Sequence, residues 1–127
     1  MKSNESAEDY LEAILMLAEK GEAVRSVDIA RLLGYKKSSV CVGMKHLLEK
    51  GHIVFSDNGH ITLTESGMQI AQKTYERHKT LTDWFLSLGI SQETAARDAC
   101  RVEHFLSDAS FEAIKNVVSD QKAISDN

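Results

Sequence analysis

The stretch from residue 26 to residue 63 restricts the fold more than any other part of the chain. It contains two short amphipathic segments joined at Gly34, and then two extended runs joined through Asn58-Gly59. Glycine often ends a helix because it adopts the left-handed conformation easily, and Asn-Gly is a strong hairpin signal. This order predicts a helix-turn-helix followed directly by a two-stranded wing.

The two helices of this motif have recognisable limits. We expect the first to be capped by Ser26 and to end at Gly34, and the second to begin near Lys37 and to stop at Gly51. Gly43 lies inside the second helix, where glycine costs about 1 kcal/mol relative to alanine. It therefore indicates a close approach to DNA or to the first helix of the motif. The apolar side of the second helix is expected to comprise Val40, Met44, Leu47 and Leu48.

The other elements complete a mainly α fold. The wing strands are expected at residues 52–55 and 60–63, with positive φ tolerated by both Asn58 and Gly59 in the turn. Thr64 and Ser91 are expected to cap two later helices. The helices outside the motif are predicted at residues 6–19, 65–88, 92–106 and 110–118. We therefore expect a winged helix-turn-helix DNA-binding domain at residues 1–64, and a linking helix with a helical dimerisation domain at residues 65–127.

Charge is distributed unevenly along the chain. The whole sequence has a net charge of −4, but residues 23–50 include six basic and two acidic side chains, so that segment carries +4 and the remainder −8. A basic segment on an acidic body favours a local phosphate-binding surface, although a merely solvated face remains an alternative. The expected partner is double-stranded operator DNA, contacted by Arg25, Lys36, Lys37, Ser38, Ser39, Cys41, Val42 and Lys45.

Composition also limits the compartment. No stretch of about 18 uncharged apolar residues is present, so we expect no membrane span. The polar, acidic start does not resemble a signal peptide, which favours the cytoplasm. In that compartment Cys41 and Cys100 are expected to be free thiols.

Apolar side chains near the end of the chain suggest self-association. Unless they are paired, they would remain exposed to water, and a helical homodimer interface would cover them. The alternative is that they fold back on the long helix. The residues concerned are Phe105, Leu106, Phe111, Ile114, Val117 and Val118.

Six residues could together hold a cation. Asp9 and Glu12 are three apart on the first helix, His78 lies in the long helix, and Cys100, Glu103 and His104 have the spacing i, i+3, i+4 of one helix face. Oxygen, nitrogen and sulfur donors that converge from rigid elements suit a divalent metal. Taken singly, each has another interpretation: a solvated helix start, a structural histidine or a small core cysteine.

Several motifs resemble the diphtheria-toxin-repressor family, and in particular its manganese-transport-regulator branch. They are residues 8–14 (EDYLEAI), the helix-turn-helix segments 28–30 and 38–40, the junction 63–67 (LTESG), Arg77-His78, and residues 100–107 (CRVEHFLS). The resemblance covers about residues 7–118. It implies a homodimeric, metal-dependent repressor of metal-uptake genes, with the metal-binding residues in the second domain and the first helix. The implied ligands are Asp9, Glu12, His78, Cys100, Glu103 and His104.

The ligand set is a hybrid of two branches of that family. The manganese branch has glutamate at the position of Cys100, and the iron-sensing branch has methionine at the position of Asp9. Carboxylate and imidazole suit Mn²⁺ and Fe²⁺, whereas a thiolate favours Fe²⁺, Co²⁺ or Zn²⁺. We expect Mn²⁺ or Fe²⁺ as the cofactor, with Co²⁺, Zn²⁺ and Cd²⁺ as further candidates in vitro.

Two other functions fit parts of the pattern. The first is a winged-helix regulator that responds to an organic ligand or to oxidation of Cys41 and Cys100. The second is a small metallo-hydrolase built on the same ligands. The second lacks a separate general base and leaves the wing and the basic helix unexplained, so we expect a regulator and not an enzyme.

Overall fold

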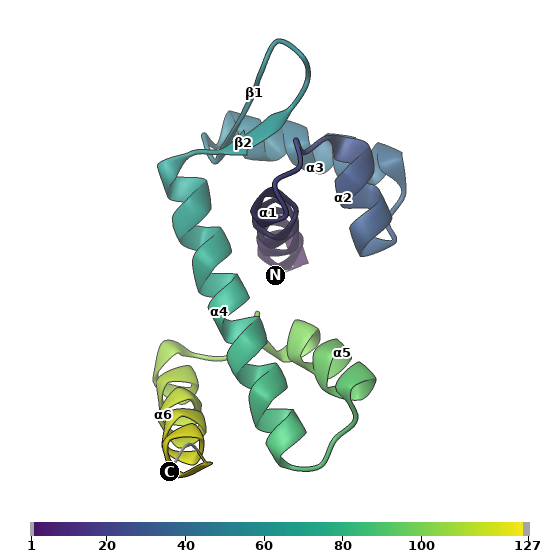
Figure 1. Cartoon of the computed structure of the whole chain (residues 1–127). Coiled ribbons are helices and arrows are strands. Elements are labelled where there is room, and N and C mark those ends of the chain that lie inside the picture. The colour runs from purple at the N-terminus through teal and green to yellow at the C-terminus, as the bar shows by residue number, and fades with distance from the viewer. Residues whose placement is uncertain (1, 126–127) are drawn as a thin grey trace. The chain divides into compact units, whose positions relative to one another are not determined.

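The structure is a computed structural model that describes the backbone from residue 2 to residue 125 and the side chains from residue 6 to residue 122. The chain forms two compact units, residues 1–73 and residues 74–127, which are described separately below. The elements between residues 2 and 125 are α1 (Lys2–Glu19), α2 (Ser26–Leu33), α3 (Lys37–Glu49), β1 (Ile53–Phe55), β2 (Ile61–Leu63), α4 (Glu65–Ser87), α5 (Gln92–Val102) and α6 (Asp108–Ser125) (Figure 1). The predicted order, a winged helix-turn-helix followed by helices, is confirmed.

The first unit is organised around α1, which packs against α2, α3 and β2. Val40, Met44 and Leu47 of α3 are buried, with the i, i+4, i+7 spacing of one helix face. Leu48 is 44% exposed, so its predicted place on the apolar side is wrong: it lies beyond the edge of that face. Helix α3 therefore contributes a narrow stripe of three residues to the core of this unit, beside buried residues of α1, α2 and the wing strands.

The start of α2 differs from the prediction. The N-cap residue is Arg25, and Ser26 is already the first helical residue. The local reason is Asp28, whose carboxylate accepts a hydrogen bond of 2.9 Å from the backbone N–H of Arg25. The predicted end is confirmed, because Gly34 has a φ of 71° and its N–H donates to the carbonyl of Ala30.

The wing is a two-stranded antiparallel sheet in which Ile53 pairs with Leu63 and Phe55 with Ile61. Within the described chain, positive φ in its turn occurs at Gly59 (79°) and not at Asn58. The predicted turn is therefore present, and of the two residues that tolerate positive φ only Gly59 adopts it. The turn closes through a bond from the N–H of Gly59 to the carbonyl of Ser56, the pattern of a type I turn completed by a left-handed glycine.

Two helical glycines mark close approaches in the first unit. A side chain at Gly43 would overlap the ring of Tyr10 on α1, so the predicted close approach is to α1 and not to α2. A side chain at Gly67 would overlap the carbonyl oxygen of His52, where α4 leaves the wing. Thr64 caps α4 as predicted, because its hydroxyl accepts from the N–H of Gly67 at 3.3 Å.

The second unit consists of α5, α6 and the part of α4 from Thr74 onward. Helix α6 runs beside α4 in the same direction (Figure 1), with ion pairs from Lys115 to Glu76 (3.2 Å) and from Lys122 to Asp83 (2.8 Å). Ser91 caps α5 as predicted, since its hydroxyl accepts from the N–H of Thr94.

The lengths of α5 and α6 were predicted incorrectly. Helix α5 ends at Val102 and not near residue 106, and α6 covers residues 108–125 and not 110–118. Ser107 explains the early start of α6, because its hydroxyl accepts a bond from the N–H of Ser110. At the end of α5 the N–H of Phe105 donates to the carbonyl of Val102, so the chain leaves the helix in a tighter turn.

The six apolar residues near the end of the chain differ in solvent exposure, and Leu106 and Ile114 are intermediate. Phe111 (4% exposed) and Val118 (6%) are buried, so for these two the folding-back alternative holds. Phe105 (69%) and Val117 (48%) remain exposed in the single chain. The described helices include none that is long and apolar enough to cross a membrane.

The approach at Gly67 generates a stability prediction. Alanine normally stabilises a helix relative to glycine by about 1 kcal/mol. At Gly67 we expect Gly67→Ala to destabilise the fold by about 1–3 kcal/mol instead, because its methyl group meets a backbone carbonyl that cannot rotate away. Urea denaturation monitored by circular dichroism measures the change. Gln69→Ala, at an exposed position of the same helix, is the matched control; an equal or greater stability of Gly67→Ala would contradict the prediction.

Candidate metal ligands and nucleic-acid interface

Asp9 and Glu12 both lie on α1 in the first unit, and each residue is 7% exposed. Between them in the sequence stands Tyr10, whose ring packs on Gly43 of α3. Burial and, secondly, the charge of Asp9 raise the pKa of the Tyr10 hydroxyl above its ordinary value. The contacts of the ring are with Gly43 and with the ring of Tyr35.

The second unit brings three of the predicted ligands together. Nδ1 of His78 on α4 lies 3.0 Å from Oε2 of Glu103, and Nε2 of His104 lies 3.5 Å from Oε1 of the same carboxylate. The Glu103 side chain is fully buried and that of His104 is 2% exposed. Glu103 thus stands between two imidazoles. Cys100 lies one helical turn earlier on α5 and is exposed.

Arg77 determines where Glu103 and His104 lie. Its Nη1 donates to the carbonyl oxygens of Glu103 (3.1 Å) and Leu106 (2.7 Å), and its Nη2 pairs with Asp108 at 2.6 Å. In a continuing helix the Glu103 carbonyl would accept a bond from an amide four residues later. Arg77 supplies a bond to that carbonyl just beyond the end of α5, where the N–H of Phe105 already donates to the carbonyl of Val102 in a tighter turn. The guanidinium also lies over the Phe111 ring, 5.1 Å from its centroid.

Three residues of the second unit offer donor atoms to candidate metal-binding groups: His78, Cys100 and Glu103. Carboxylate and imidazole suit Mn²⁺ and Fe²⁺, and a thiolate favours a softer ion. His104 lies beside Glu103 but belongs to neither group. Arg77 holds the backbone of the turn that carries Glu103. Of the six residues predicted as ligands, Asp9 and Glu12 belong to the first unit and the other four to the second.

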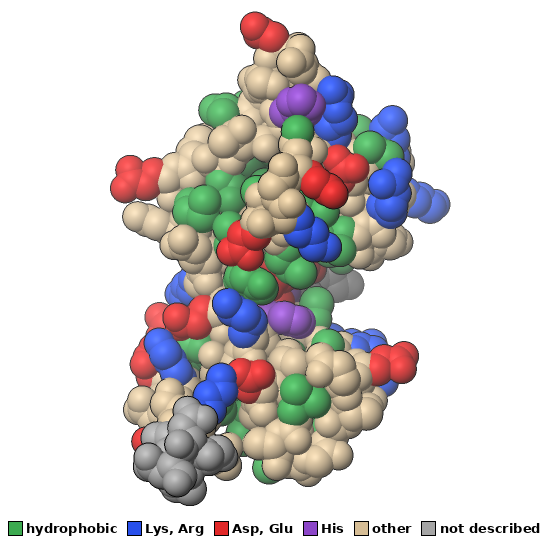
Figure 2. All heavy atoms as spheres, viewed as in Figure 1, with side chains coloured by type: hydrophobic (Ala, Val, Ile, Leu, Met, Phe, Trp, Pro, Cys, Tyr) green, Lys and Arg blue, Asp and Glu red, His purple; other side chains and the backbone are tan. Residues whose placement is uncertain are grey.

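The outward side of α3 matches the predicted nucleic-acid interface. All eight residues predicted to contact DNA are exposed, whereas the buried residues of α3 face the core. Figure 2 shows Lys and Arg side chains gathered over the α2–α3 end of the first unit. Val42, an apolar residue that is 56% exposed between polar neighbours, is available to contact a base or a thymine methyl group.

Sequence reasoning missed two residues that position the candidate site. Arg77 entered the sequence analysis only as the neighbour of His78 in a motif, and its burial is visible only in the folded chain. Tyr10 entered it only as part of the motif at residues 8–14. The glycine inside α3 indicated a close partner but did not identify it, because the partner is distant in the sequence.

The fold and these features together define a winged-helix DNA-binding protein with a helical second unit. Two family models match the chain in sequence. The N-terminal DNA-binding domain of the iron-dependent repressors matches residues 2–61, and the metal-binding and dimerisation domain of the same repressors matches residues 64–123.

Related proteins agree with these matches. An uncharacterised HTH-type transcriptional regulator of Methanocaldococcus jannaschii is 37% identical over 114 residues, covering 88% of this chain and 91% of that protein. The transcriptional regulator MntR of Escherichia coli is 37% identical over 112 residues, covering 87% of this chain and 72% of MntR. The chain belongs to the iron-dependent repressor family, whose members are transcriptional regulators.

Solved structures show the same fold. A manganese-dependent transcriptional repressor in complex with manganese matches with a TM-score of 0.82 and 27% identity, covering 89% of this chain and 52% of that one. The IdeR protein of T. acidophilum matches with a TM-score of 0.74 and 28% identity, covering 88% and 53%. The chain therefore spans about half the length of these solved relatives.

The contacts of Arg77 predict a large loss on its removal. Arg77→Ala would leave two carbonyl groups without their charged donor, and we expect it to destabilise the second unit by roughly 3 kcal/mol. Asp108→Asn is the matched control. Its side chain is 76% exposed, so loss of this ion pair is expected to change stability by at most about 1 kcal/mol. Guanidinium denaturation would measure both, and equal effects would refute the assignment of the main role to the carbonyl bonds.

Proposed function

We propose that this chain is a metal-activated repressor that binds operator DNA as a homodimer when Mn²⁺ or Fe²⁺ is bound, and that it controls metal-uptake genes in the cytoplasm. The observation that carries the metal dependence is the contact of the buried Glu103 carboxylate with the imidazole of His78, two donors of a candidate metal-binding group. Family membership supports the repressor role. The choice between Mn²⁺ and Fe²⁺ is part of the proposal.

The proposed cation takes ligands from both units. Asp9 and Glu12 would contribute carboxylates from α1, and His78, Cys100, Glu103 and His104 would contribute the remaining donors. When bound, the cation would supply positive charge that offsets repulsion between carboxylates and, where Cys100 is deprotonated, a thiolate.

The proposed DNA contact is made by the N-terminal part of α3 and by Arg25 at the foot of the wing. Lys36, Lys37 and Lys45 are exposed there and would bind phosphates. Ser38, Ser39, Cys41 and Val42 would face the major groove. We assign this role to a DNA-binding domain of residues 1–64, and metal binding and dimerisation to residues 65–127.

The proposed homodimer would cover the exposed apolar residues of the second unit. Phe105 and Val117 are large, apolar and exposed, and burying such side chains favours association by about 25 cal/mol per Å². A two-fold symmetric dimer presents two copies of α3, so its operator would be pseudo-palindromic, with half-sites separated by about one helical turn or a multiple of it.

The metal dependence is tested by gel shift with a duplex selected from a random-sequence pool by the Mn²⁺-loaded protein. We expect binding with Mn²⁺ or Fe²⁺ and a loss of about 5–150-fold in affinity with a chelator. Glu103→Gln should abolish that difference, because it removes the charge but keeps the shape. Glu76→Gln, on the exposed side of α4, is the control and should retain it. Chelator-resistant binding that responds to peroxide would favour thiol sensing by Cys41 and Cys100, both of which are exposed.

The DNA-binding face is tested by salt dependence. Each phosphate contact contributes about 0.9 to the slope of log affinity against log salt. Lys37→Ala and Lys45→Ala should each lower the magnitude of that slope by about one, and should weaken binding to all sequences similarly. Lys20→Ala, an exposed lysine at the end of α1, should leave the slope unchanged. Unaltered slopes in both α3 variants would remove this face from the interface.

A further inference from the structure

We infer that Tyr10 is the positioning residue through which α1 controls the orientation of α3, and that Gly43 is the place on α3 where this control is exerted. The inference rests on the proposed function, because it concerns how occupation of α1 by its metal reaches the DNA-reading helix. It assigns the coupling between metal binding at α1 and the orientation of α3 to the contact of the Tyr10 ring with Gly43.

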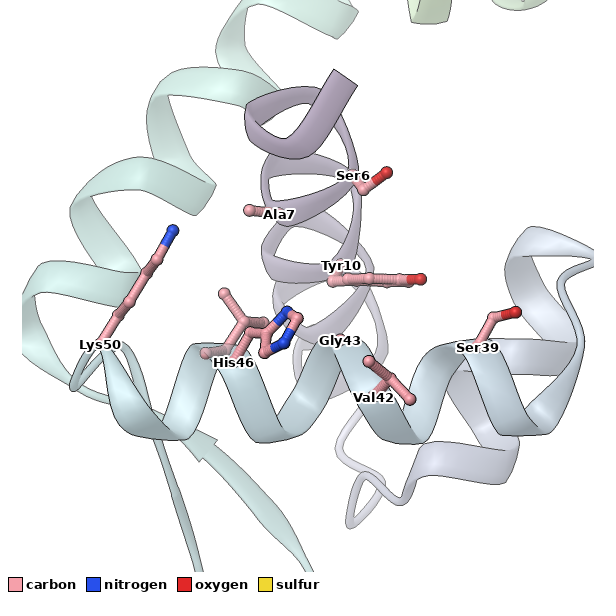
Figure 3. A pocket seen from close by; sticks show the side chains of 9 residues that line it. Ser6, Ala7, Tyr10, Ser39, Val42, Gly43, His46 and Lys50 are labelled. Carbon is pink, nitrogen blue, oxygen red and sulfur yellow. The ribbon is translucent and has the colours of Figure 1, made fainter. Parts of the chain in front are cut away.

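The first observation is the close packing of the two residues. A Cβ built on Gly43 would overlap Cε2 of Tyr10 and would lie 2.8 Å from its Cδ2, so the ring occupies the space that any other residue would need. Figure 3 shows Tyr10 extending from α1 across the backbone of α3 at Gly43, with Val42 and His46 on either side. The residue type at position 43 thus sets the distance between the two helices.

The second observation is that Tyr10 also contacts the turn before α3. Its ring packs edge to face with Tyr35, with the centroids 6.0 Å apart and the planes at 86°. Tyr35 lies in the turn between α2 and α3. The buried ring of Tyr10 therefore contacts both the middle of α3 and the turn that precedes it. A shift of Tyr10 would therefore tilt α3 and not merely translate it.

The third observation is free space beside the contact. A cavity of about 220 Å³ lies between α1 and α3, and Tyr10 and Gly43 form part of its wall. Other residues that line it are Ser6, Ser39, His46 and Lys50. Packed interfaces usually resist displacement, so the space beside the ring is where a shift of Tyr10 would be accommodated.

The last step connects the ring to the proposed ligands. Tyr10 follows Asp9 directly and precedes Glu12 by two residues on the same helix, so any rotation or shift of α1 that the carboxylates undergo moves the ring as well. Asp9 and Glu12 would hold the cation, and Tyr10 would convert the position of α1 into the position of α3. The ring, rather than the hydroxyl, performs this role.

The experiment measures the coupling between metal and DNA in the full-length protein. The selected duplex is titrated with Mn²⁺ present and with chelator, and the ratio of the two dissociation constants is the coupling. Mn²⁺ binding without DNA is followed in parallel by electron paramagnetic resonance. We expect Tyr10→Phe to retain the wild-type ratio. Tyr10→Ala and Gly43→Ala should bring the ratio close to one while Mn²⁺ still binds.

A double variant makes the test specific to this contact. In Tyr10→Ala the space opposite Gly43 is empty, so adding Gly43→Ala should cause no further loss, and the two effects should be strongly non-additive. Gly43→Ala removes no buried atoms, so it also serves as the test where Tyr10→Ala does not fold.

The outcomes separate the inference from the proposed function. If the DNA affinity of the wild-type protein does not depend on metal, both the proposed function and the inference are overturned. Full metal dependence in the wild type together with an unchanged ratio in Gly43→Ala would overturn the inference alone. Loss of Mn²⁺ binding in Gly43→Ala would also overturn it, because the contact would then act on the ligands and not on their transmission to α3.

Discussion

The bonds from Arg77 to two backbone carbonyls are the interaction on which the second unit depends. Chain direction must reverse after α5 so that α6 can run beside α4, and a reversal leaves carbonyl groups without helical partners. Arg77 satisfies those of Glu103 and Leu106 from one rigid, permanently charged fork. The same bonds hold the Glu103 carboxylate against His78, the residue that follows Arg77 in α4. The bonds that shape the turn after α5 therefore also place the candidate ligands Glu103 and His78 beside each other.

In the first unit, the arrangement depends on the two faces of α3, one buried against the core and one exposed to solvent. Its buried face is a stripe of three residues, which is too narrow to fix a helix tightly by apolar packing alone. The ring of Tyr10 on Gly43 adds a contact in the middle of the helix where a side chain would otherwise separate α3 from α1. The opposite face stays exposed and basic, and it includes every residue of α3 that we propose to contact DNA. A narrow core makes α3 well suited to being oriented by a neighbouring helix.

Much of the fold could be predicted from the sequence, because local signals dominate it. Gly34, Thr64 and Ser91 end or cap helices through bonds to residues at most four positions away. Some failures were also local, such as the start of α2, where Asp28 makes Arg25 the cap. At the end of α5, helical periodicity continued through residue 106, but the chain turns after Val102, and Arg77 donates to the carbonyls of Glu103 and Leu106 in that turn.

The candidate site could be predicted only where local sequence spacing determines it, as with the fold. The spacing of Cys100, Glu103 and His104 predicted one helix face, but α5 ends before Glu103, so only Cys100 lies on the helix, and the turn that follows brings His104 to the buried carboxylate. The spacing could not show which residues enforce this arrangement, because a buried arginine and a helical glycine have no periodic signature. Arg77 and Gly43 act across more than 25 residues of sequence, where only the folded chain reveals a partner.

These two attachments explain how a small ion can control a large surface. The free energy of metal binding changes the orientation of a helix only if the ligands are attached to helices that move as rigid bodies. If the ligands stood on flexible loops, local rearrangement of those loops would take up the change. Glu103 and His104 are fixed to α4 through Arg77, and α1 is fixed to α3 through Tyr10. Each group of candidate ligands thus has a rigid connection to its own unit. A cation shared between the groups would act on two helices rather than on six side chains, and the number of arrangements left to the recognition helix would fall accordingly.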